Sequence, residues 1–463
     1  MAILKFTGNP LIDNGNAVIA MMCNKNHFHE VTQEDIVKNI DSFLVVIQDH
    51  FNDLHATKKE RDYSKRGFKQ HFSLLYTTNH YLFGINNKIK NPDTGKKETV
   101  QTGQDFIKTF KKEVMEILEG KNKLSQEKQR QSNDNICRFC GRPADLVITK
   151  DIVPLATALT QKNLGQVHCC NCCYLSILFN FLTMINVRSS EASKGFYMFY
   201  HFSDERCMIE YARQQFLQLK REMLASLETK IGYQYEVLVQ DLLDRFKRFK
   251  KKMTKKNFKN FFITVYYLLN DNRGASFKYI NVPNGMCVFL SVLSTTENIW
   301  SQIKRNLISI DSYEKFLRGE FHCADEAGIP KYGFEDPTIL KLYLREVSGL
   351  DEHFITAAQN IGKGLVKYYR IQSGKWVENY AKRIRVKKSY SFINELLDEN
   401  ESYFSLYGEN IFSISDVKQV VGESSAMAYR LIKYYIYNAM DDEEREIYID
   451  ICRKQKNQGQ EGA

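Results

Sequence analysis

The segment Cys137-Arg-Phe-Cys140-Gly-Arg is followed further along the chain by His168-Cys-Cys-Asn-Cys-Cys173. Two C-x-x-C pairs separated in this way have the spacing of a four-thiolate zinc site, in which each pair forms one turn around the metal. Gly141 follows the first pair, where a tight turn favours a residue without a side chain. Cysteines gathered in two tight clusters argue against the alternative, a group of free thiols buried in a core. The sequence therefore predicts a module at about residues 135–175 that binds one structural zinc ion.

The second cysteine pair can be chosen in two ways. Cys169 with Cys172 and Cys170 with Cys173 are both C-x-x-C, and a four-ligand site needs only one of these pairs. The sequence gives a slight preference for the set Cys137, Cys140, Cys169 and Cys172. The pair Cys170 and Cys173 is the alternative.

Composition places the chain among soluble globular proteins with a polyanionic partner. It has 463 residues, a hydrophobic fraction of 43%, 11 cysteines and a net charge of +10. The first residues lack the apolar core of a signal peptide, and the longest apolar runs are too short or too broken to span a bilayer. Clustered and single cysteines suit a reducing cytoplasm, and nucleic acid is the commonest polyanion there. We therefore expect a cytoplasmic protein with no membrane partner.

The order of apolar patterns predicts an α+β fold. Helical spacing covers residues 36–54, 106–118 and 233–249, and Phe196–Phe202 is typical of a strand. From about Lys331 onward helical segments follow one another with few strand signals. We therefore predict a mixed N-terminal region over 1–330 with the zinc module inserted in it, and a helical bundle over 331–463.

The first residues of the chain carry signals for turns and for a helix start. Gly8, Asn9, Pro10 and Gly15 are turn formers on either side of a short apolar pair. Thr32-x-x-Asp35 is typical of a helix start with an acidic first turn.

One block of the sequence is strongly basic. Between Arg245 and Lys259 nine of fifteen residues are Lys or Arg, none is acidic, and phenylalanines are interleaved. Such a block repels itself unless phosphates neutralise it, which predicts a nucleic-acid contact, although a solvated helix face is the alternative. The predicted contacts are Arg245, Lys247, Arg248, Lys250, Lys251, Lys252, Lys255, Lys256 and Lys259. A weaker basic cluster runs from Lys382 to Lys388.

Between the two cysteine pairs the chain has the outline of an HNH nuclease without its base. The segment Lys150-Asp-Ile-Val-Pro-Leu155 places Lys150 and Asp151 where that pattern has its general-base histidine. Without an imidazole to activate water beside a metal, phosphodiester hydrolysis lacks its base. We therefore predict a chain that is not an enzyme.

These motifs together resemble a known family. The opening Thr7-Gly-Asn-Pro-Leu-Ile-Asp-Asn-Gly15, the helix start at Thr32 and the paired cysteine motifs resemble the CXXC–CXXC large subunits of type I-B CRISPR Cascade complexes. The length agrees, and the helical C-terminal part is similar to the small subunit of such complexes. The doubled second cysteine pair departs from the simple family pattern.

The resemblance implies a non-enzymatic role in an RNA-guided complex. In such complexes the guide RNA reads the target DNA by base pairing, and a protein reads a short flanking motif, the PAM. The resemblance implies that the large subunit reads this motif, supports opening of the duplex and docks the effector. Its partners are then the guide RNA, target DNA, the backbone and small subunits, and a helicase-nuclease or transposition proteins. Turn asparagines that can present donors to a groove edge are candidate PAM contacts: Asn9, Asn79, Asn86 and Asn87. Two other interpretations are a zinc-containing HNH-like nuclease and a purely structural scaffold.

Overall fold

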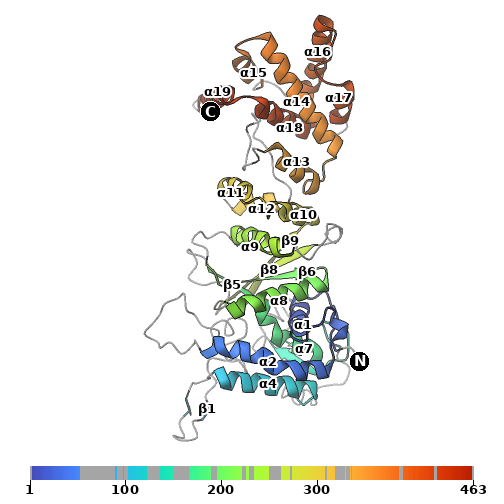
Figure 1. Ribbon diagram of the computed structural model, residues 1–463, viewed down its shortest axis with the longest axis vertical. Helices are drawn as coiled ribbons and strands as arrows, with labels where there is room; N and C mark the ends of the chain where they lie inside the picture. Colours follow the sequence, from blue (N-terminus) through green and yellow to red (C-terminus); the bar gives the residue numbers. More distant parts are fainter. Residues whose placement is uncertain are drawn as a thin grey trace. The chain divides into compact units, whose positions relative to one another are not determined.

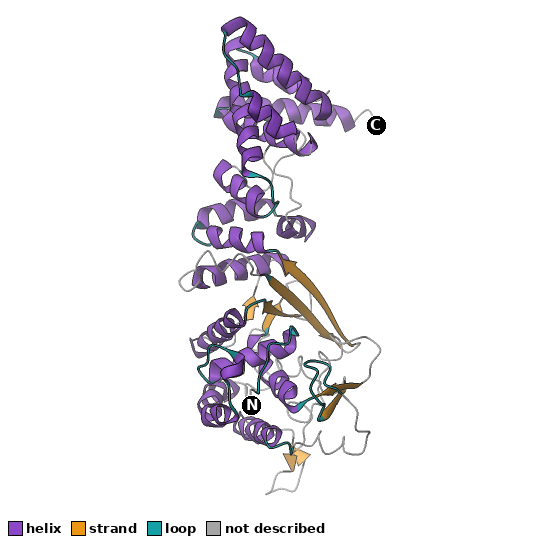
Figure 2. Ribbon diagram, turned by 90° about the vertical axis from the view of Figure 1, so that its right-hand side faces the viewer, coloured by secondary structure: helices purple, strands orange, loops and turns teal. Residues whose placement is uncertain are grey.

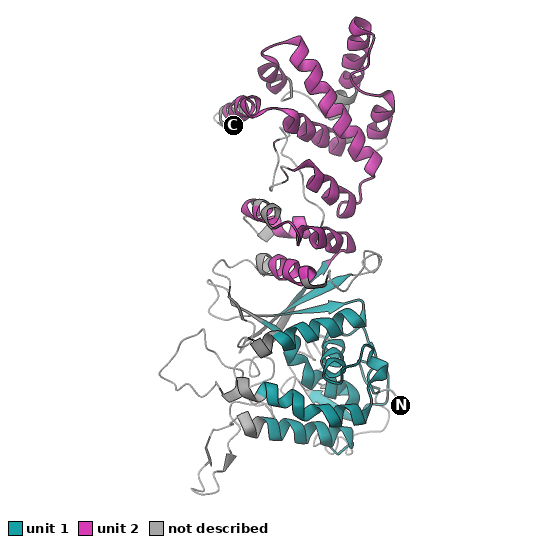
Figure 3. Ribbon diagram, viewed as in Figure 1, with its two compact units in different colours: residues 1–232, 261–281 teal, residues 233–260, 282–463 magenta. Residues whose placement is uncertain are grey.

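The chain forms two compact units in a computed structural model (Figure 3). The first comprises residues 1–232 and 261–281, and the second comprises residues 233–260 and 282–463. The structure describes residues 3–52, 89–90, 97–98, 103–121, 136–149, 166–188, 196–221, 226–228, 234–249, 262–271, 274–307, 310–318, 329, 334, 336–384, 389–421 and 425–460.

The first unit combines helices with short strands (Figures 1 and 2). Its described elements are α1 (Pro10–Met22), η1 (Phe28–Glu30), α2 (Gln33–Asn52), β1 (Ile89–Lys90), β2 (Lys97–Glu98), α4 (Gly103–Leu118), β3 (Leu146–Thr149), β4 (Gln166–Cys169), α7 (Asn171–Phe179), η4 (Asn180–Thr183), β5 (Ile185–Arg188), β6 (Phe196–Phe202), α8 (Glu205–Arg221), β7 (Ser226–Glu228), β8 (Ile263–Asp271) and β9 (Gly274–Val282).

Helix α1 is the centre of the first unit. Figure 1 shows it enclosed by α2, α7 and α8, and it also packs against β6. Every residue from Pro10 to Met21 is buried, including the polar Asp13, Asn14 and Asn16. Because buried polar groups need hydrogen-bond partners, this helix is tied to its surroundings by specific bonds as well as by apolar contact.

The chain turns into α1 through a hydrogen-bonded cap. Asn9 is the N-cap, and its Oδ1 accepts a hydrogen bond from the backbone N–H of Leu11 at 3.0 Å. Asp13 Oδ1 accepts from the backbone N–H of Thr7 at 2.8 Å and from its hydroxyl at 2.9 Å. Asp13 Oδ2 lies 3.0 Å from His201 Nε2 on β6. The opening motif is therefore the start of a buried helix.

The prediction of a turn at Gly15 is wrong. Gly15 lies in the middle of α1, where a Cβ atom would come within 1.7 Å of the carbonyl oxygen of Ser176 on α7. A glycine is needed at this point for the close approach of two helices, not for a turn.

A five-stranded sheet supports α1 and α8. Its strand order is β7-β5-β6-β8-β9; β6 is antiparallel to β5 and β8, and β5 is parallel to β7. Register is set by pairs such as Tyr200 with Val265. A separate antiparallel pair, β3 and β4, places Leu146 opposite Cys169. This strand pair therefore lies next to the second cysteine motif.

The second unit is built mainly of helices. Its described elements are α9 (Gln234–Phe249), α10 (Asn284–Leu293), α11 (Glu297–Asn306), α12 (Ile310–Arg318), α13 (Pro337–Glu346), α14 (Glu352–Gln372), α15 (Trp376–Ile384), α16 (Ser389–Tyr407), α17 (Ile414–Val421), α18 (Ser425–Ala439) and α19 (Asp442–Gln460). Helix α14 packs along α18, where Gly362 allows close contact with Tyr435.

The α+β architecture with a helical C-terminal region agrees with the sequence prediction. Helix α9 and α10–α12 belong to the same compact unit as the helices after residue 331. The predicted domain boundary at residues 330/331 stays a prediction.

Candidate metal centre

The first cysteine pair lies on a tight turn. The backbone N–H of Cys137 donates to the carbonyl of Arg142 at 2.7 Å, and Gly141 N–H donates back to the Cys137 carbonyl at 3.0 Å. Gly141 has φ +73°, a left-handed conformation that strains any residue with a side chain. The turn predicted around the metal is therefore present, with its glycine in the expected role.

The second pair lies where β4 turns into α7. Cys170 is the N-cap of α7 with extended backbone, and its Sγ accepts a hydrogen bond from the backbone N–H of Cys173 at 3.4 Å. The two residues stand three apart in the first helical turn, so their sulfurs lie on the same side. The N-terminal end of a helix favours thiolates through its backbone N–H groups and its dipole.

Four sulfurs converge between these two segments. One Sγ each from Cys137, Cys140, Cys170 and Cys173 lies within 4.8 Å of all the others, and Cys140 and Cys170 Sγ are 3.5 Å apart. In a tetrahedral site with zinc–sulfur bonds of about 2.3 Å, neighbouring sulfurs are about 3.8 Å apart. The arrangement therefore fits a metal ion such as zinc with four protein ligands. Such a set leaves no position open for water or substrate, as is typical of structural sites.

The structure favours the alternative second pair over the slightly preferred one. Cys169 ends β4 and is fully buried, and its Sγ donates to the carbonyl of Cys170 at 3.3 Å. Cys172 lies between the two ligands in the first turn of α7, and it is not one of the four converging residues. The preference for Cys169 and Cys172 is corrected for a geometric reason. Cys169 faces Cys137, but only Cys170 and Cys173 belong with Cys137 and Cys140 to the group whose sulfurs all lie within 4.8 Å of one another.

Shared protons dominate the electrostatics of the cluster. Hydrogen bonds from the thiols of Cys169, Cys170 and Cys173 hold the pKa of Cys137 far below its usual value. A hydrogen bond from Cys173 is the main cause that lowers the pKa of Cys140 to about 6. The pKa of the donor Cys173 is raised in turn. Thiolate is the form that binds zinc, so the lowered pKa values of Cys137 and Cys140 favour the zinc-binding form of these two ligands.

Hydrogen bonds join the cysteine module to α1. The Ser176 hydroxyl, one turn after Cys173, donates to Asn16 Oδ1 on α1 at 2.5 Å. Asn180 Nδ2 donates to the Leu11 carbonyl at 3.4 Å. Together with the close approach at Gly15, these bonds fix α7 and its two cysteines against the helix that carries the N-terminal motif.

The basic block is only partly described. Arg245 is 5% exposed and its Nε donates to Asp241 at 2.5 Å, so its guanidinium is neutralised inside the unit; Phe246 is 1% exposed. The prediction that Arg245 contacts phosphates is corrected, because the helical period of α9 turns it inward with Asp241. Lys247 is exposed near the end of α9. The side chain of Arg248 and the predicted contacts Lys250, Lys251, Lys252, Lys255, Lys256 and Lys259 lie outside the described residues.

Of the other predicted site residues, one is described by the structure and the rest are not. Asn9 has a structural role as the N-cap of α1. The candidate PAM contacts Asn79, Asn86 and Asn87 lie outside the described residues, as do Lys150 and Asp151 of the HNH-like outline.

A second cluster was not found by sequence reasoning. His27 Nδ1 contacts the carboxylate of Glu205, His29 stands next to them, and the guanidinium of Arg206 donates to His27 Nε2 at 2.8 Å. Because both ring nitrogens of His27 are engaged and a cation lies beside the ring, this cluster suits a structural link between η1 and α8 better than a metal site. The only signal in the sequence would have been the pair of histidines, since Glu205 is far away in the chain.

Comparisons with known proteins give no assignment. No family model, no curated protein and no solved structure matches this chain. Among the described residues, no helix is both long and apolar enough to cross a membrane.

Proposed function

We propose that this chain is the large subunit of an RNA-guided complex similar to type I-B CRISPR Cascade. In this role it binds nucleic acid, recognises the flanking motif of target DNA, supports R-loop formation and docks an effector. It performs no catalysis. Its partners are guide RNA, target DNA, the backbone and small subunits, and a helicase-nuclease or transposition proteins.

The observation that carries the proposal is the contact between the two motifs on which the resemblance rests. The opening motif forms α1 and the second cysteine pair begins α7; these helices meet at Gly15 and Ser176. The two motifs that carry the resemblance therefore lie in contact in the folded chain.

The proposed metal has a structural role. Four cysteine ligands, three of them buried, suit zinc and leave no site at which zinc would activate water. A structural metal is compatible with both the binding subunit and the HNH-like outline. Lys150 and Asp151, which stand in place of the general-base histidine, argue against the nuclease. The scaffold interpretation has no observation of its own in its favour.

Nucleic-acid binding is supported by charge. The chain carries a net charge of +10, and the basic block keeps eight cations after Arg245 is set aside from the nine. A row of cations binds phosphates and releases counterions, so it supplies affinity without sequence preference.

The experiment that tests the function is reconstitution of the full chain with guide RNA and the subunits encoded beside it. We expect the chain to join the complex and to confer binding to DNA that carries one flanking motif. Changing Lys250, Lys251, Lys255 and Lys256 to Ala should weaken binding to all sequences alike. The slope of log affinity against log salt should also flatten by about one for each phosphate that the variant no longer binds.

The controls separate the three interpretations. Changing the exposed Lys363, Lys367, Lys418 and Lys454 to Ala gives the same charge change and should leave the slope unaltered. Metal-dependent cleavage of DNA by the chain alone would support the nuclease instead. A chain that joins protein partners but binds no nucleic acid, free or assembled, would be a scaffold.

A further inference from the structure

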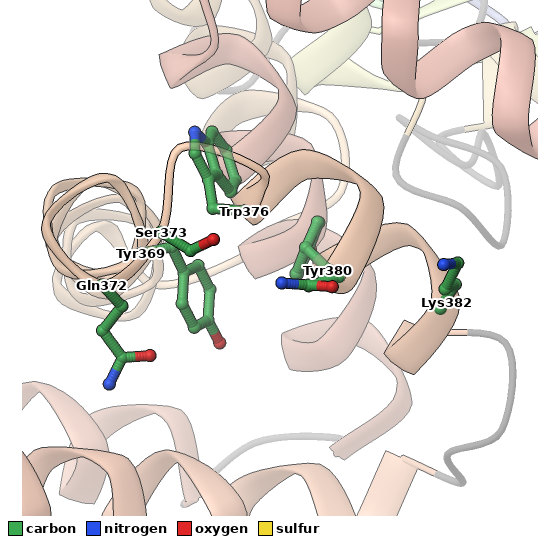
Figure 4. Close-up of a pocket in the computed structure, with 7 residues that line it drawn as sticks. Tyr369, Gln372, Ser373, Trp376, Tyr380 and Lys382 are labelled. Carbon is green, nitrogen blue, oxygen red and sulfur yellow. The ribbon is translucent and has the colours of Figure 1, made fainter.

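A pocket of about 340 Å³ lies in the second unit between the end of α14 and α15 (Figure 4). This volume is at the lower end of the range for small-molecule sites, which suits a single ring system with its substituents. The described residues that line the pocket are Tyr369, Gln372, Ser373, Trp376, Asn379, Tyr380 and Lys382.

Three aromatic rings form the wall of the pocket. Tyr369 stacks with Trp376 at a centroid distance of 6.1 Å and an interplanar angle of 18°, and Tyr380 lies 5.7 Å from Tyr369. Trp376 and Tyr380 are each 5% exposed, whereas Tyr369 is half-buried. Tyr380 is tilted by 37° from Tyr369 and by 45° from Trp376, so the open ring surface that suits stacking of another planar group is that of Tyr369, next to Trp376.

Hydrogen bonds hold two of these rings in place. The Tyr369 hydroxyl donates to Glu399 on α16 at 2.7 Å, and Trp376 Nε1 donates to Glu444 on α19 at 2.8 Å. Because the rings are fixed before any ligand arrives, stacking on them costs little conformational entropy.

The charges around the pocket favour an uncharged ring that is attached to an anionic group. None of the lining residues that the structure describes is acidic, and Lys382 is exposed at the far end of α15. The nearby carboxylates Glu399 and Glu444 are already bonded to Tyr369, Trp376 and Arg370, so an aromatic cage for a cation would lack its counter-charge.

Amide and hydroxyl groups add the capacity to bond a ring edge. Gln372 and Asn379 are amides on the pocket lining. Gln372 Nε2 donates one hydrogen to the Tyr368 hydroxyl, which leaves its second hydrogen and its Oε1, and the amide of Asn379, to bond a ligand. The buried hydroxyl of Tyr380 has no hydrogen-bond partner within the described part of the chain. Because this oxygen is itself buried, a ligand in the pocket would meet the ring of Tyr380 and not its hydroxyl.

We propose that this pocket binds one unstacked nucleobase of a single-stranded nucleic acid. The base stacks on the half-buried Tyr369 beside Trp376, its polar edge meets the amides of Gln372 and Asn379, and the ammonium of Lys382 contacts an adjoining phosphate. Stacking of this kind tolerates every base and is the usual way in which proteins hold single strands. The inference rests on the proposed function only for the source of the strand.

The test uses tryptophan emission of the full chain. The chain has two tryptophans, so the Trp300→Phe variant leaves Trp376 as the only reporter. The probes are a thymidine dodecamer and an abasic dodecamer with the same phosphates. We expect the thymidine strand to quench Trp376, and the abasic strand to leave its emission unchanged.

Binding of the same two probes to variants completes the test. Tyr369→Leu should weaken binding of the thymidine strand roughly tenfold. Tyr407→Leu is the matched control, because Tyr407 is an exposed tyrosine of the same unit outside the pocket, and it should bind as the parent does. Lys382→Ala changes an exposed side chain, so it leaves no cavity in the core. It should flatten the slope of log affinity against log salt by about one.

Several results would overturn the inference. The first is that both strands bind equally and neither quenches Trp376. The second is that a Tyr369→Leu variant with the melting temperature of the parent binds the thymidine strand with wild-type affinity. The third is that tetramethylammonium quenches Trp376 and the thymidine strand does not. Retained PAM-dependent binding in the assembled complex alongside any of these results would leave the proposed function standing. Loss of that binding in the complex, with the thymidine strand still quenching Trp376, would overturn the proposed function alone.

Discussion

The two units stabilise closely packed helices by different means. In the first, α1 is buried on all sides with polar residues inside it, and its neighbour α7 begins at the four-cysteine cluster. In the second, α14 is amphipathic, packs on α18 through Gly362, and is joined to α19 by Arg370 and Glu444. A short helix that starts at a metal site depends on the metal, whereas a bundle of longer helices relies on apolar burial. The following predictions test this difference.

Removal of the metal should have the largest effect. We expect about one zinc per chain by elemental analysis, and loss of zinc in Cys137→Ser and Cys170→Ser variants. The first unit should then lose on the order of 5 kcal/mol of stability or more, because binding energy at a structural site is folding energy. Hydrogen exchange should show faster exchange in α1 and α7 and unchanged protection in α14 and α18.

Two further variants sharpen the ligand assignment. Cys172→Ser should keep its zinc, since Cys172 is not among the four converging residues. Cys452→Ser in α19 is a control for the loss of a thiol elsewhere. A folded protein with less than about a tenth of one zinc per chain would contradict the metal assignment.

Two glycines, one in each unit, offer a matched pair. A Cβ on Gly15 would lie 1.7 Å from the carbonyl oxygen of Ser176, and a Cβ on Gly285 would lie 1.5 Å from that of Glu346. Each change to Ala should cost about 3 kcal/mol, because neither neighbour is a flexible side-chain end. Only Gly15→Ala should also weaken zinc retention against a chelator, since Ser176 lies on the helix that carries Cys170 and Cys173.

The control for this pair is Gly374→Ala. Within the described part of the chain nothing lies within 4 Å of a Cβ at Gly374, so the effect of this change on stability should stay within about 0.5 kcal/mol. Urea denaturation measures the stabilities. Equal zinc retention in the Gly15 and Gly285 variants would break the proposed link between α1 and the metal.

Much of the fold could be predicted from local pattern. The Thr32 signal marks the start of α2, where Thr32 and Asp35 exchange hydrogen bonds, and the predicted strand Phe196–Phe202 is β6. These elements follow from period and capping, which are local properties.

The errors arise where a distant segment decides. Gly15 has the same chemistry in a turn and at a helix crossing, and only the carbonyl of Ser176 distinguishes them. Likewise, the spacing of two overlapping C-x-x-C pairs contains no information on which sulfurs face the first pair. Arg245 is different: Asp241 stands four residues before it on a helix of predicted period, so its ion pair could have been inferred.

The boundary predicted near residue 331 can be tested with two C-terminal fragments. We expect fragment 331–463 to fold as a helical, cooperatively melting unit. Helix α13 packs on α10, and the Tyr343 hydroxyl donates to the carbonyl of Phe316 at 2.9 Å. Fragment 282–463 should therefore be more stable by about 2 kcal/mol, because it keeps the Tyr343 ring buried. Circular dichroism melts of both fragments measure this, and a disordered 331–463 fragment would move the boundary towards residue 282.

The smallest predicted effect concerns the ion pair that joins α14 to α19. Glu444 accepts from Arg370 Nε at 3.0 Å and Nη2 at 2.5 Å, from Trp376 Nε1 at 2.8 Å and from the backbone N–H of Asp441 at 2.9 Å. Chiefly through the Arg370 bonds, this environment lowers the pKa of Glu444 to about 2, from 4.5. A carboxylate with a lowered pKa stabilises the folded state fully above pH 4.5, and the contribution is lost as pH falls towards 2.

Replacing this carboxylate should reveal that pH dependence in the second unit alone. Because the Glu444 side chain keeps 15% of its exposure, we expect Glu444→Gln to cost about 1–2 kcal/mol at pH 7, and the difference from wild type to shrink steadily between about pH 5 and pH 3. Glu443→Gln, which changes an exposed neighbour, should show no such trend. Urea unfolding of fragment 282–463 across this pH range measures the difference free of the metal site. A constant difference between Glu444→Gln and wild type at every pH would mean that packing against Trp376, and not the charge paired with Arg370, holds α19 to the bundle.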